Sequence, residues 1–460
     1  MTTVPAKKGL GLWMVTSLVT GNMIGSGVFL LPSTLAHYGS IGLLAWALTS
    51  VGATILALVF ARFAALMPRV GGPYAYCRAG FGDFVGFQVA YNYWIATCVG
   101  NAAIVVALVG YITVFVPILA TNHFDALLVG LALLWGLTYV NIVGVREAGW
   151  IQLVTTILKL IPIGLIAIVG LFHLQPHYLT AFNTTGHSHL WALNAAAIVT
   201  FWSFVGVESA TIPADDVVDA KRNIPRATIL GTVIAAAVYV CSATAIMGLV
   251  PMDVLAQSTA PFADAAGALF GSAGRWIIAV GAIIACFGTL NGWLLMQGHI
   301  PLAAANDGLF PAFFAKRAES GTPITGLVVS SGIISVLLFM NANQSLVDEF
   351  TIIILLATLA SVIPYMITAL ALIMTLIKDK SANLQQLRAS IVVAVMAAVY
   401  GFWLVMGAGE KIVYYGMLLF LSGIFVYVWL AWQARKRMSA VANQPVDAPI
   451  LNRASDPAGC

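Results

Sequence analysis

Apolar residues run through this chain in twelve long segments, and charged or Gly/Pro-rich stretches separate one segment from the next. Each segment is close to the roughly 20 residues that an α-helix needs to cross a lipid bilayer. The pattern therefore predicts an all-α polytopic membrane protein with twelve transmembrane helices. We expect the helices near residues 11–36, 41–66, 84–116, 126–143, 149–172, 191–213, 227–250, 274–303, 323–341, 350–377, 386–406 and 412–433.

The composition agrees with this pattern. The 460 residues are 61% hydrophobic and only 8% charged, whereas soluble domains average about 25% charged residues. Lys7 and Lys8 lead into an apolar segment that is too long for a cleavable signal peptide. The five cysteines show no metal-ligand spacing, and we predict neither a bound metal nor a cofactor. Residues 436–460 are polar and contain prolines, so we predict a disordered tail there.

The lysines and arginines indicate the orientation in the membrane. With the N-terminus inside, eighteen of the 21 basic residues fall on the inner side; Arg275 and Lys411 fall outside, and Lys159 lies within a segment. Positive residues collect in cytoplasmic loops, so both termini are predicted to be cytoplasmic. Six histidines, His123 among them, fall in the predicted outer loops. They suit a role as acid sensors, but we favour the plainer interpretation that they are polar loop residues where Lys and Arg are avoided.

The first apolar segment contains a sequence that works against a continuous helix. GNMIGSGVFLLP begins at Gly21 and adds Gly25 and Gly27 before it ends at Pro32. Gly21 and Gly25 have the small-xxx-small spacing of a helix-packing contact. Packing alone does not explain the Gly-Ser-Gly sequence followed by a proline, so we predict a break in this helix.

The sixth segment repeats the feature, because TFWSFVGVESATIP carries Gly206 and Glu208 before Pro213. Unwound backbone and buried charge are costly in lipid and persist where they line a cavity or serve a function. Interrupted helices at matching places in two halves are typical of secondary transporters. A break offers free N–H groups to an anion and free carbonyls to a cation. The two breaks together therefore predict a site for a zwitterion.

Motifs along nearly the whole chain resemble one transporter family. GNMIGSGVFLLP, GGPYAYCRAGFG, WSFVGVESA, KRNIPRATI, APFADAA, AANDGLFP and GTPITGL occur in this order. The chain resembles the amino acid–polyamine–organocation superfamily, and most of all its bacterial basic amino acid/polyamine antiporters of the arginine/agmatine exchanger type.

This resemblance implies one transporter domain over residues 1–435 that works by alternating access. Two inverted repeats of five helices, about 11–172 and 191–377, would be followed by two extra helices at about 386–433. It also implies a bacterial inner-membrane protein that is commonly a homodimer, whose ligands are small amino acids or amines and not nucleic acid.

The resemblance further implies site residues in both breaks and in neighbouring helices. Ser26 and Gly27 would bind the substrate carboxylate, and carbonyls in the second break would bind its ammonium group. Trp293 shares one helical face with Thr289 and Gln297 and would contact the cationic side chain. The residues implied in substrate binding are Asn22, Ile24, Ser26, Gly27, Asn101, Trp202, Ser203, Val205, Trp293 and the position of Ala357. Those implied in gating or coupling are Tyr74, Tyr93, Glu208 and Tyr365.

Two residues depart from the exchanger pattern. Ala357 stands where the arginine/agmatine exchanger has a hydroxyl group, which weakens the prediction of arginine as the substrate. Lys159 lies nearly ten residues from either end of its segment, too deep to reach water easily, where the exchangers have apolar residues. Proton-coupled, sodium-independent permeases of the superfamily carry a lysine at this position, so we assign Lys159 a coupling role.

Two modes of transport therefore stay open. The motifs favour exchange of a cationic amino acid for its amine, whereas Lys159 and Ala357 favour proton-coupled uptake. We do not expect an enzyme, because the sequence has no HExxH motif and Glu208 has no carboxylate partner nearby in sequence. A channel would not need paired broken helices, and no filter-like repeat is present.

Overall fold

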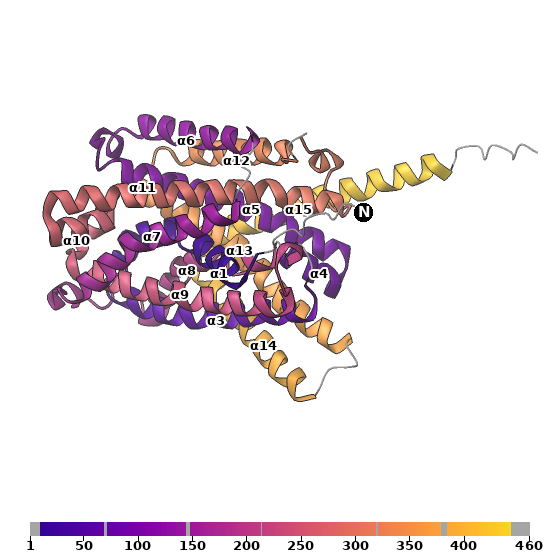
Figure 1. Cartoon of the computed structure of the whole chain (residues 1–460), viewed down its shortest axis with the longest axis horizontal. Helices are drawn as coiled ribbons and strands as arrows, with labels where there is room; N and C mark the ends of the chain where they lie inside the picture. The colour runs from indigo at the N-terminus through magenta and orange to yellow at the C-terminus, as the bar shows by residue number, and fades with distance from the viewer. Residues whose placement is uncertain are drawn as a thin grey trace, which may run out of the picture.

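The structure is a bundle of helices, most of whose axes are broadly aligned with one another (Figure 1). This computed structural model describes residues 10–68, 71–143, 148–212, 214–318, 321–378 and 384–442. Within these ranges the β pairing is limited to one bridge, between Leu10 and Val217. The prediction of an all-α membrane protein is confirmed.

Eleven helical stretches of the described chain are long and apolar enough to cross a membrane. α7 (Ala148–Leu171) has 24 residues, which at 1.5 Å per residue span about 36 Å, but its described apolar part is only Thr156–Leu171. A total of twelve spans therefore stays a prediction. The other long helices are α3 (Ile41–Leu66), α5 (Asp83–Ile112), α6 (His123–Val143), α9 (Ala220–Leu249), α11 (Pro261–Asn306), α12 (Ile324–Asn341), α13 (Leu346–Lys378), α14 (Leu384–Gly407) and α15 (Glu410–Ala442).

The first span is broken, as the sequence predicts. α1 (Leu12–Met23) ends because Ile24 has extended backbone angles, with φ −79° and ψ 91°. Gly25 follows with φ −140° and ψ −138°, and α2 (Ser26–Ala36) begins after it. All of α2 is buried in the bundle, and so is most of the half of α1 that leads to the break.

The sixth span is broken as well. α8 (His189–Phe201) gives way to the 3₁₀ helix η3 (Trp202–Phe204), and Val205 is then extended. Gly206 has φ +108°, a conformation that side chains disfavour. A short 3₁₀ helix, η4 (Ser209–Thr211), resumes the chain. Both breaks were predicted from their glycines, and the structure confirms them.

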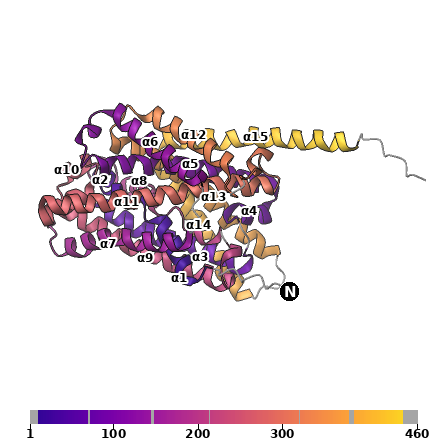
Figure 2. The same ribbon diagram turned by 45° about the horizontal axis from the view of Figure 1, so that its top comes forward.

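Helices packed around α5 hold these breaks in place. α5 contacts α4 (Pro73–Phe81), α11 and α13, and α3 packs along α9. α6 and α12 lie side by side at one edge of the bundle in both views (Figure 1 and Figure 2). The remaining short elements are α10 (Met252–Gln257), η1 (Pro117–Ala120), η2 (Pro176–Leu179), η5 (Ala214–Asp216) and η6 (Ala312–Ala315).

α11 comprises two helices that meet at a kink at Gly271, where φ is +69°, so the span predicted from residue 274 corresponds to the second of them. One predicted boundary was wrong. α15 continues to Ala442 and projects beyond the bundle (Figure 2), so the start of the predicted disordered tail is helical. Its sequence AWQARKRMSAVA consists largely of strong helix formers. Residues 443–460 lie outside the described residues.

Candidate functional site

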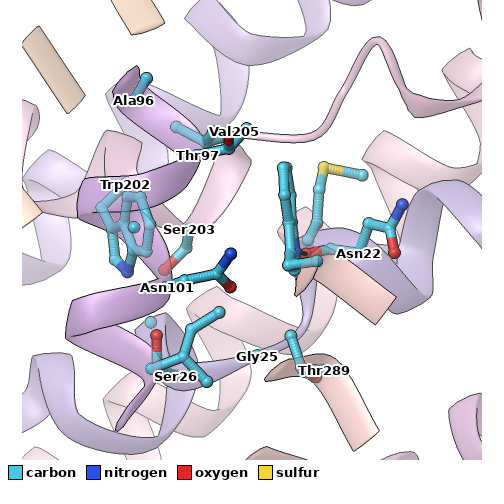
Figure 3. A pocket seen from close by; sticks show the side chains of 15 residues that line it. Asn22, Gly25, Ser26, Ala96, Thr97, Asn101, Trp202, Ser203, Val205 and Thr289 are labelled. Carbon is cyan, nitrogen blue, oxygen red and sulfur yellow. Dashed lines mark hydrogen bonds between the residues drawn. The ribbon is translucent and has the colours of Figure 1, made fainter. Parts of the chain in front are cut away.

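The two breaks meet at a buried cavity between α5 and α11 (Figure 3). Its free volume is about 20 Å³, room for about one water molecule. A substrate of amino acid size therefore needs the surrounding side chains to move. The cavity is lined by Asn22, Met23, Gly25, Ser26, Gly27, Ala96, Thr97, Gly100, Asn101, Ile104, Trp202, Ser203, Val205, Thr289 and Trp293.

The two breaks are in direct contact. A Cβ atom on Gly27 would overlap Ser203 Oγ and would lie 3.2 Å from Ser203 Cα. Only a glycine therefore lets the start of α2 approach η3 so closely. The amide of Asn22 points away from the cavity (Figure 3) and donates to Ser209 Oγ over 3.0 Å. These contacts join residues that are far apart in sequence into one site.

The start of α2 lies at the cavity wall. Ser26 and Gly27 belong to its first turn and line the cavity. The first N–H groups of a helix have no carbonyl partner within it, and they form the positive end of the helix dipole. This end of α2 is therefore suited to bind a carboxylate.

The end of α1 has the opposite polarity and already holds a cation from the chain itself. Lys159 on α7 is buried, and its Nζ donates to Gly21 O at 2.7 Å and to Ile24 O at 3.1 Å. It also donates to Thr289 Oγ1 at 3.1 Å. Free carbonyls at a helix C-terminus attract positive charge. The ammonium group of Lys159 therefore stabilises the broken end of α1.

Carbonyls of the second break also have partners. Trp202 O accepts from the Val205 N–H at 3.2 Å, and Ser203 O accepts from the Tyr239 hydroxyl at 2.9 Å. Because a carbonyl oxygen has two lone pairs, each is still able to accept from a substrate ammonium group.

Two tryptophans flank the cavity. Trp202 lies on one side of it (Figure 3), and Trp293 comes from α11. The Trp293 indole N–H donates to Asn22 O at 3.2 Å, which fixes the ring beside the first break. Aromatic faces attract cations, so these rings suit a positively charged ligand.

Four polar atoms around the cavity have no hydrogen-bond partner in the described chain. Asn101 Nδ2 donates to Gln297 Oε1 at 2.6 Å, which leaves Asn101 Oδ1 and Gln297 Nε2 unpaired. Ser26 Oγ and Ser203 Oγ are also buried without partners. Buried polar groups are nearly always hydrogen-bonded. Three of these four atoms, on Ser26, Asn101 and Ser203, belong to residues that line the cavity, and they therefore indicate a polar ligand.

A hydrogen-bonded cluster of three side chains, which we name the gate after its predicted role, lies beside the site. Glu208 is fully buried, and its carboxylate accepts hydrogen bonds from the hydroxyl groups of Tyr93 on α5 and Tyr365 on α13. Tyr365 Oη also accepts from the Gly206 N–H at 3.2 Å. The gate therefore joins the second break to two of the surrounding helices.

A second, larger cavity of about 620 Å³ reaches the other side of this gate. Tyr93 and Met296 line it, together with residues near the predicted inner face such as Arg317. Met296 Sδ in turn accepts from Asn22 Nδ2 at 3.4 Å. We name this cavity the inner vestibule. Only a thin layer of side chains separates it from the binding cavity.

Tyr74 lies at the mouth of the inner vestibule. Its hydroxyl donates to Asp307 Oδ2 at 3.2 Å, and the same oxygen lies 3.3 Å from Arg78 Nη1. Burial, and then the nearby Asp307, raise the pKa of Tyr74 above its ordinary value. Tyr74 therefore stays protonated near neutral pH and remains a donor.

Most of the residues implied in binding come together at the cavity, and two do not. Ile24 does not line it, because its carbonyl faces Lys159. Ala357 is fully buried in α13 and is absent from the cavity wall, so its methyl group does not reach the site in this conformation.

Several lining residues were not named as site residues from the sequence. They are Met23, Gly25, Ala96, Thr97, Gly100, Ile104 and Thr289. Gly25 had been placed in the predicted break, and helical spacing had placed Thr289 on the face of Trp293. Thr97 and Gly100 lie within about one helical turn of Asn101, so the same spacing was a usable signal for them.

Two broken membrane helices around a buried polar cavity, with a gate and a vestibule on one side, define a secondary transporter. A family model described as amino acid permease matches residues 10–431. The chain belongs to this family of transporters, so it is not an enzyme.

Several named proteins are similar to this chain over most of its length. A Bacillus subtilis (strain 168) protein, whose name suggests an arginine/ornithine antiporter, is 34% identical over 94% of this chain and 99% of its own length. A "Putrescine transporter PotE" from Haemophilus influenzae (strain ATCC 51907 / DSM 11121 / KW20 / Rd) is 31% identical over 92% of this chain and 97% of its own length. A "Cadaverine/lysine antiporter" of Escherichia coli (strain K12) is 33% identical over 88% of this chain and 90% of its own length.

Proposed function

We propose that this protein exchanges a cationic amino acid for an amine by alternating access. The observation that carries the proposal is the meeting of two helix breaks at one cavity whose lining residues include three unpaired polar atoms. The names of the relatives, which concern arginine, ornithine, lysine, cadaverine and putrescine, support the cationic class of substrate.

In this proposal the substrate is held at both of its ends. Its carboxylate binds at the start of α2, beside Ser26 and Gly27, and its α-ammonium group binds at the carbonyls of the second break. The cationic side chain extends toward Trp293 and Asn101, where an aromatic face and the unpaired Asn101 Oδ1 favour a positive charge. An amine lacks the carboxylate but keeps these contacts, so both exchange partners use one site.

The gate gives this site access to one side at a time. The structure has its inner vestibule open as far as Tyr93, while Tyr93 and Tyr365 close on Glu208. Separation of these groups connects the site with the vestibule. When the gate closes again after binding, the site regains access to the other side of the membrane.

Exchange in sodium-free proteoliposomes tests the proposal. Labelled arginine, lysine and ornithine are offered outside, and agmatine, cadaverine, putrescine or no amine is enclosed. We expect rapid uptake of at least one amino acid with an internal amine and little uptake without it. Equal uptake into loaded and empty vesicles would contradict exchange.

A second candidate function is proton-coupled uptake through Lys159. It is supported by the position of this buried cation, which joins α7 to the broken end of α1 and to Thr289 on α11. Because the ammonium group contacts the end of α1, gain or loss of its proton is able to change the conformation of the first break.

Lys159→Ala distinguishes the two candidates. The exchange proposal predicts that uptake against internal amine remains measurable in this variant. Proton-coupled uptake requires instead that wild-type protein fill empty vesicles when an inward proton gradient is imposed, and that Lys159→Ala abolish this uptake.

We also propose that the protein lies in the bacterial inner membrane, with both termini in the cytoplasm, and forms a homodimer. The charge distribution supports the orientation. The resemblance supports a dimer, and large apolar side chains on α14 and α15, such as Phe402 and Phe425, are exposed.

A further inference from the structure

A small pocket unrelated to the binding cavity lies between α5, α6, α12 and α13. It adjoins the start of α6 and the start of α13, which the charge distribution places on the outer face. Its walls are largely apolar and include Val105 and Leu338. Two ionisable side chains, His123 and Glu349, complete the lining.

Glu349 is the unusual member of this pocket. The residue is only 6% exposed, and the described chain offers its carboxylate no hydrogen bond or ion pair. A buried carboxylate without a partner is costly unless it takes up a proton or gains a counter-charge. The structure therefore presents a carboxylate whose partner comes from outside the chain.

Helix capping does not account for the buried position of the Glu349 carboxylate. Acidic side chains are favourable in the first turn of a helix, and both Asp348 and Glu349 lie in the first turn of α13. Asp348 already fills this role at the surface, because its N–H donates to Ser345 Oγ at 3.2 Å and its Oδ2 accepts from the same hydroxyl at 2.6 Å. Glu349 faces the pocket instead.

The size of the pocket limits the ligand. Its free volume is about 20 Å³, and one water molecule needs about 10–15 Å³. An amino acid or amine does not fit. A water molecule fits, and it is able to connect a carboxylate with an imidazole and to carry a proton between them.

We propose that His123 and Glu349 form an external proton-binding site, joined by a water molecule, that controls the outer end of α13. The pair takes up one proton from the external side. With this proton the pair is neutral and the pocket stays compact. Without it the pocket contains a net negative charge and must admit more water.

The surrounding elements supply no competing counter-charge in the pocket. α12 and α2 contain no ionisable residue, and the hydroxyl of Tyr111 on α5 donates to Phe29 O at 2.7 Å. On α6, Asp125 accepts from Asn122 Nδ2 at 2.7 Å. Other helices packed on α13 carry further ionisable groups at their outer ends, but none of these lines the pocket; they are His189, Glu410 and Lys411.

Through α13 this site is linked to transport. The same helix carries Tyr365, whose hydroxyl closes the gate at Glu208. Loosening the outer end of α13 from α5, α6 and α12 therefore changes the balance between the two access states. External acid favours the compact outer end that is present in this structure.

Sided pH measurements test the proposal. Oriented proteoliposomes hold the internal pH constant while the external pH varies from about 5 to about 8, and exchange is recorded. We expect a one-proton dependence on external pH in the wild type. Glu349→Gln imitates the neutral carboxyl, so its exchange rate should stay at the acid value over the whole pH range. His123→Gln should move the midpoint of the pH dependence. Asp348 is a neighbouring carboxylate on the surface, and Asp348→Asn should keep the wild-type dependence of exchange on external pH.

A chemical measurement is independent of transport. Dicyclohexylcarbodiimide modifies protonated carboxyl groups in apolar surroundings, and mass spectrometry locates the product. We expect modification of Glu349 to fall about tenfold or more between external pH 5 and 8, as a one-proton site requires. Unchanged modification across this range would overturn the proposal, as would a full wild-type pH profile in Glu349→Gln. A dependence on external sodium in place of pH would identify a metal cation site and overturn it as well.

Discussion

Individual residues at the cavity have distinct roles that follow from their contacts. Gly27 allows the two breaks to touch, Asn101 presents an unpaired oxygen, and Trp293 is fixed by its bond to Asn22 O. None of these roles requires a charged side chain in the cavity wall itself. In the proposed binding mode, the charges of the substrate are therefore met by helix ends, carbonyls and an aromatic face.

Replacement of Trp293 tests the aromatic contact. A cation–π contact contributes about 0.5–2 kcal/mol, so Trp293→Ala should weaken binding of a cationic amino acid by about 2- to 30-fold. Trp293→Phe keeps an aromatic face and should lose less affinity than Trp293→Ala. Equilibrium binding of labelled lysine to both purified variants measures the difference, and equal losses would show that the ring face is not used.

The short-range features of the site could be predicted from the sequence, and the long-range ones could not. The glycines around Gly25 and Gly206 predicted where the helices break, because no other residue type allows such unwinding so readily. The contact of Asn22 with Ser209 joins residues 187 positions apart, and it depends on the packing of the whole bundle. Ala357 was carried over by resemblance, and a methyl group leaves no sequence signal of the direction in which it points.

At the scale of the helices, the predicted gate joins three separate elements. α13 contributes Tyr365 to the gate, α5 contributes Tyr93, and the second break contributes Glu208. The gate therefore depends on the relative position of three elements. A shift of any one of them separates the hydrogen-bonded groups.

Removal of the gate hydroxyls tests this arrangement. A hydrogen bond to a charged group contributes about 1.5–3 kcal/mol, so Tyr93→Phe and Tyr365→Phe should each change the exchange rate about tenfold or more. Because both bind one carboxylate, the double variant should not show the sum of the two effects. Tyr139→Phe, at an exposed position on α6, serves as the control. Additive effects would show that the two tyrosines act separately.

The whole chain has a sidedness that the structure alone does not supply. The bundle has α4 near one end and α10 near the other (Figure 1), and Tyr74 on α4 lines the inner vestibule. The charge distribution assigns the first end to the cytoplasm. This assignment underlies the direction of exchange and the external position of His123.

Cysteine labelling tests the orientation. In a cysteine-free background, a single cysteine replaces either His177 in η2 or Lys316 just after η6, both at exposed positions. A membrane-impermeant maleimide should label His177→Cys in intact cells, and Lys316→Cys only after permeabilisation. The reverse result would invert the proposed topology.

The most direct test of the binding site is the affinity of Gly27→Ala for a labelled cationic amino acid. The added methyl group would overlap Ser203 Oγ and force the two breaks apart. The control is Gly288→Ala, which lies next to Thr289 on α11 and would meet no atom within 4 Å. If the paired breaks bind the substrate, the dissociation constant should rise about tenfold or more, a loss of about 1.4 kcal/mol, in Gly27→Ala and stay near the wild-type value in Gly288→Ala. Wild-type affinity in a folded Gly27→Ala protein would contradict the account.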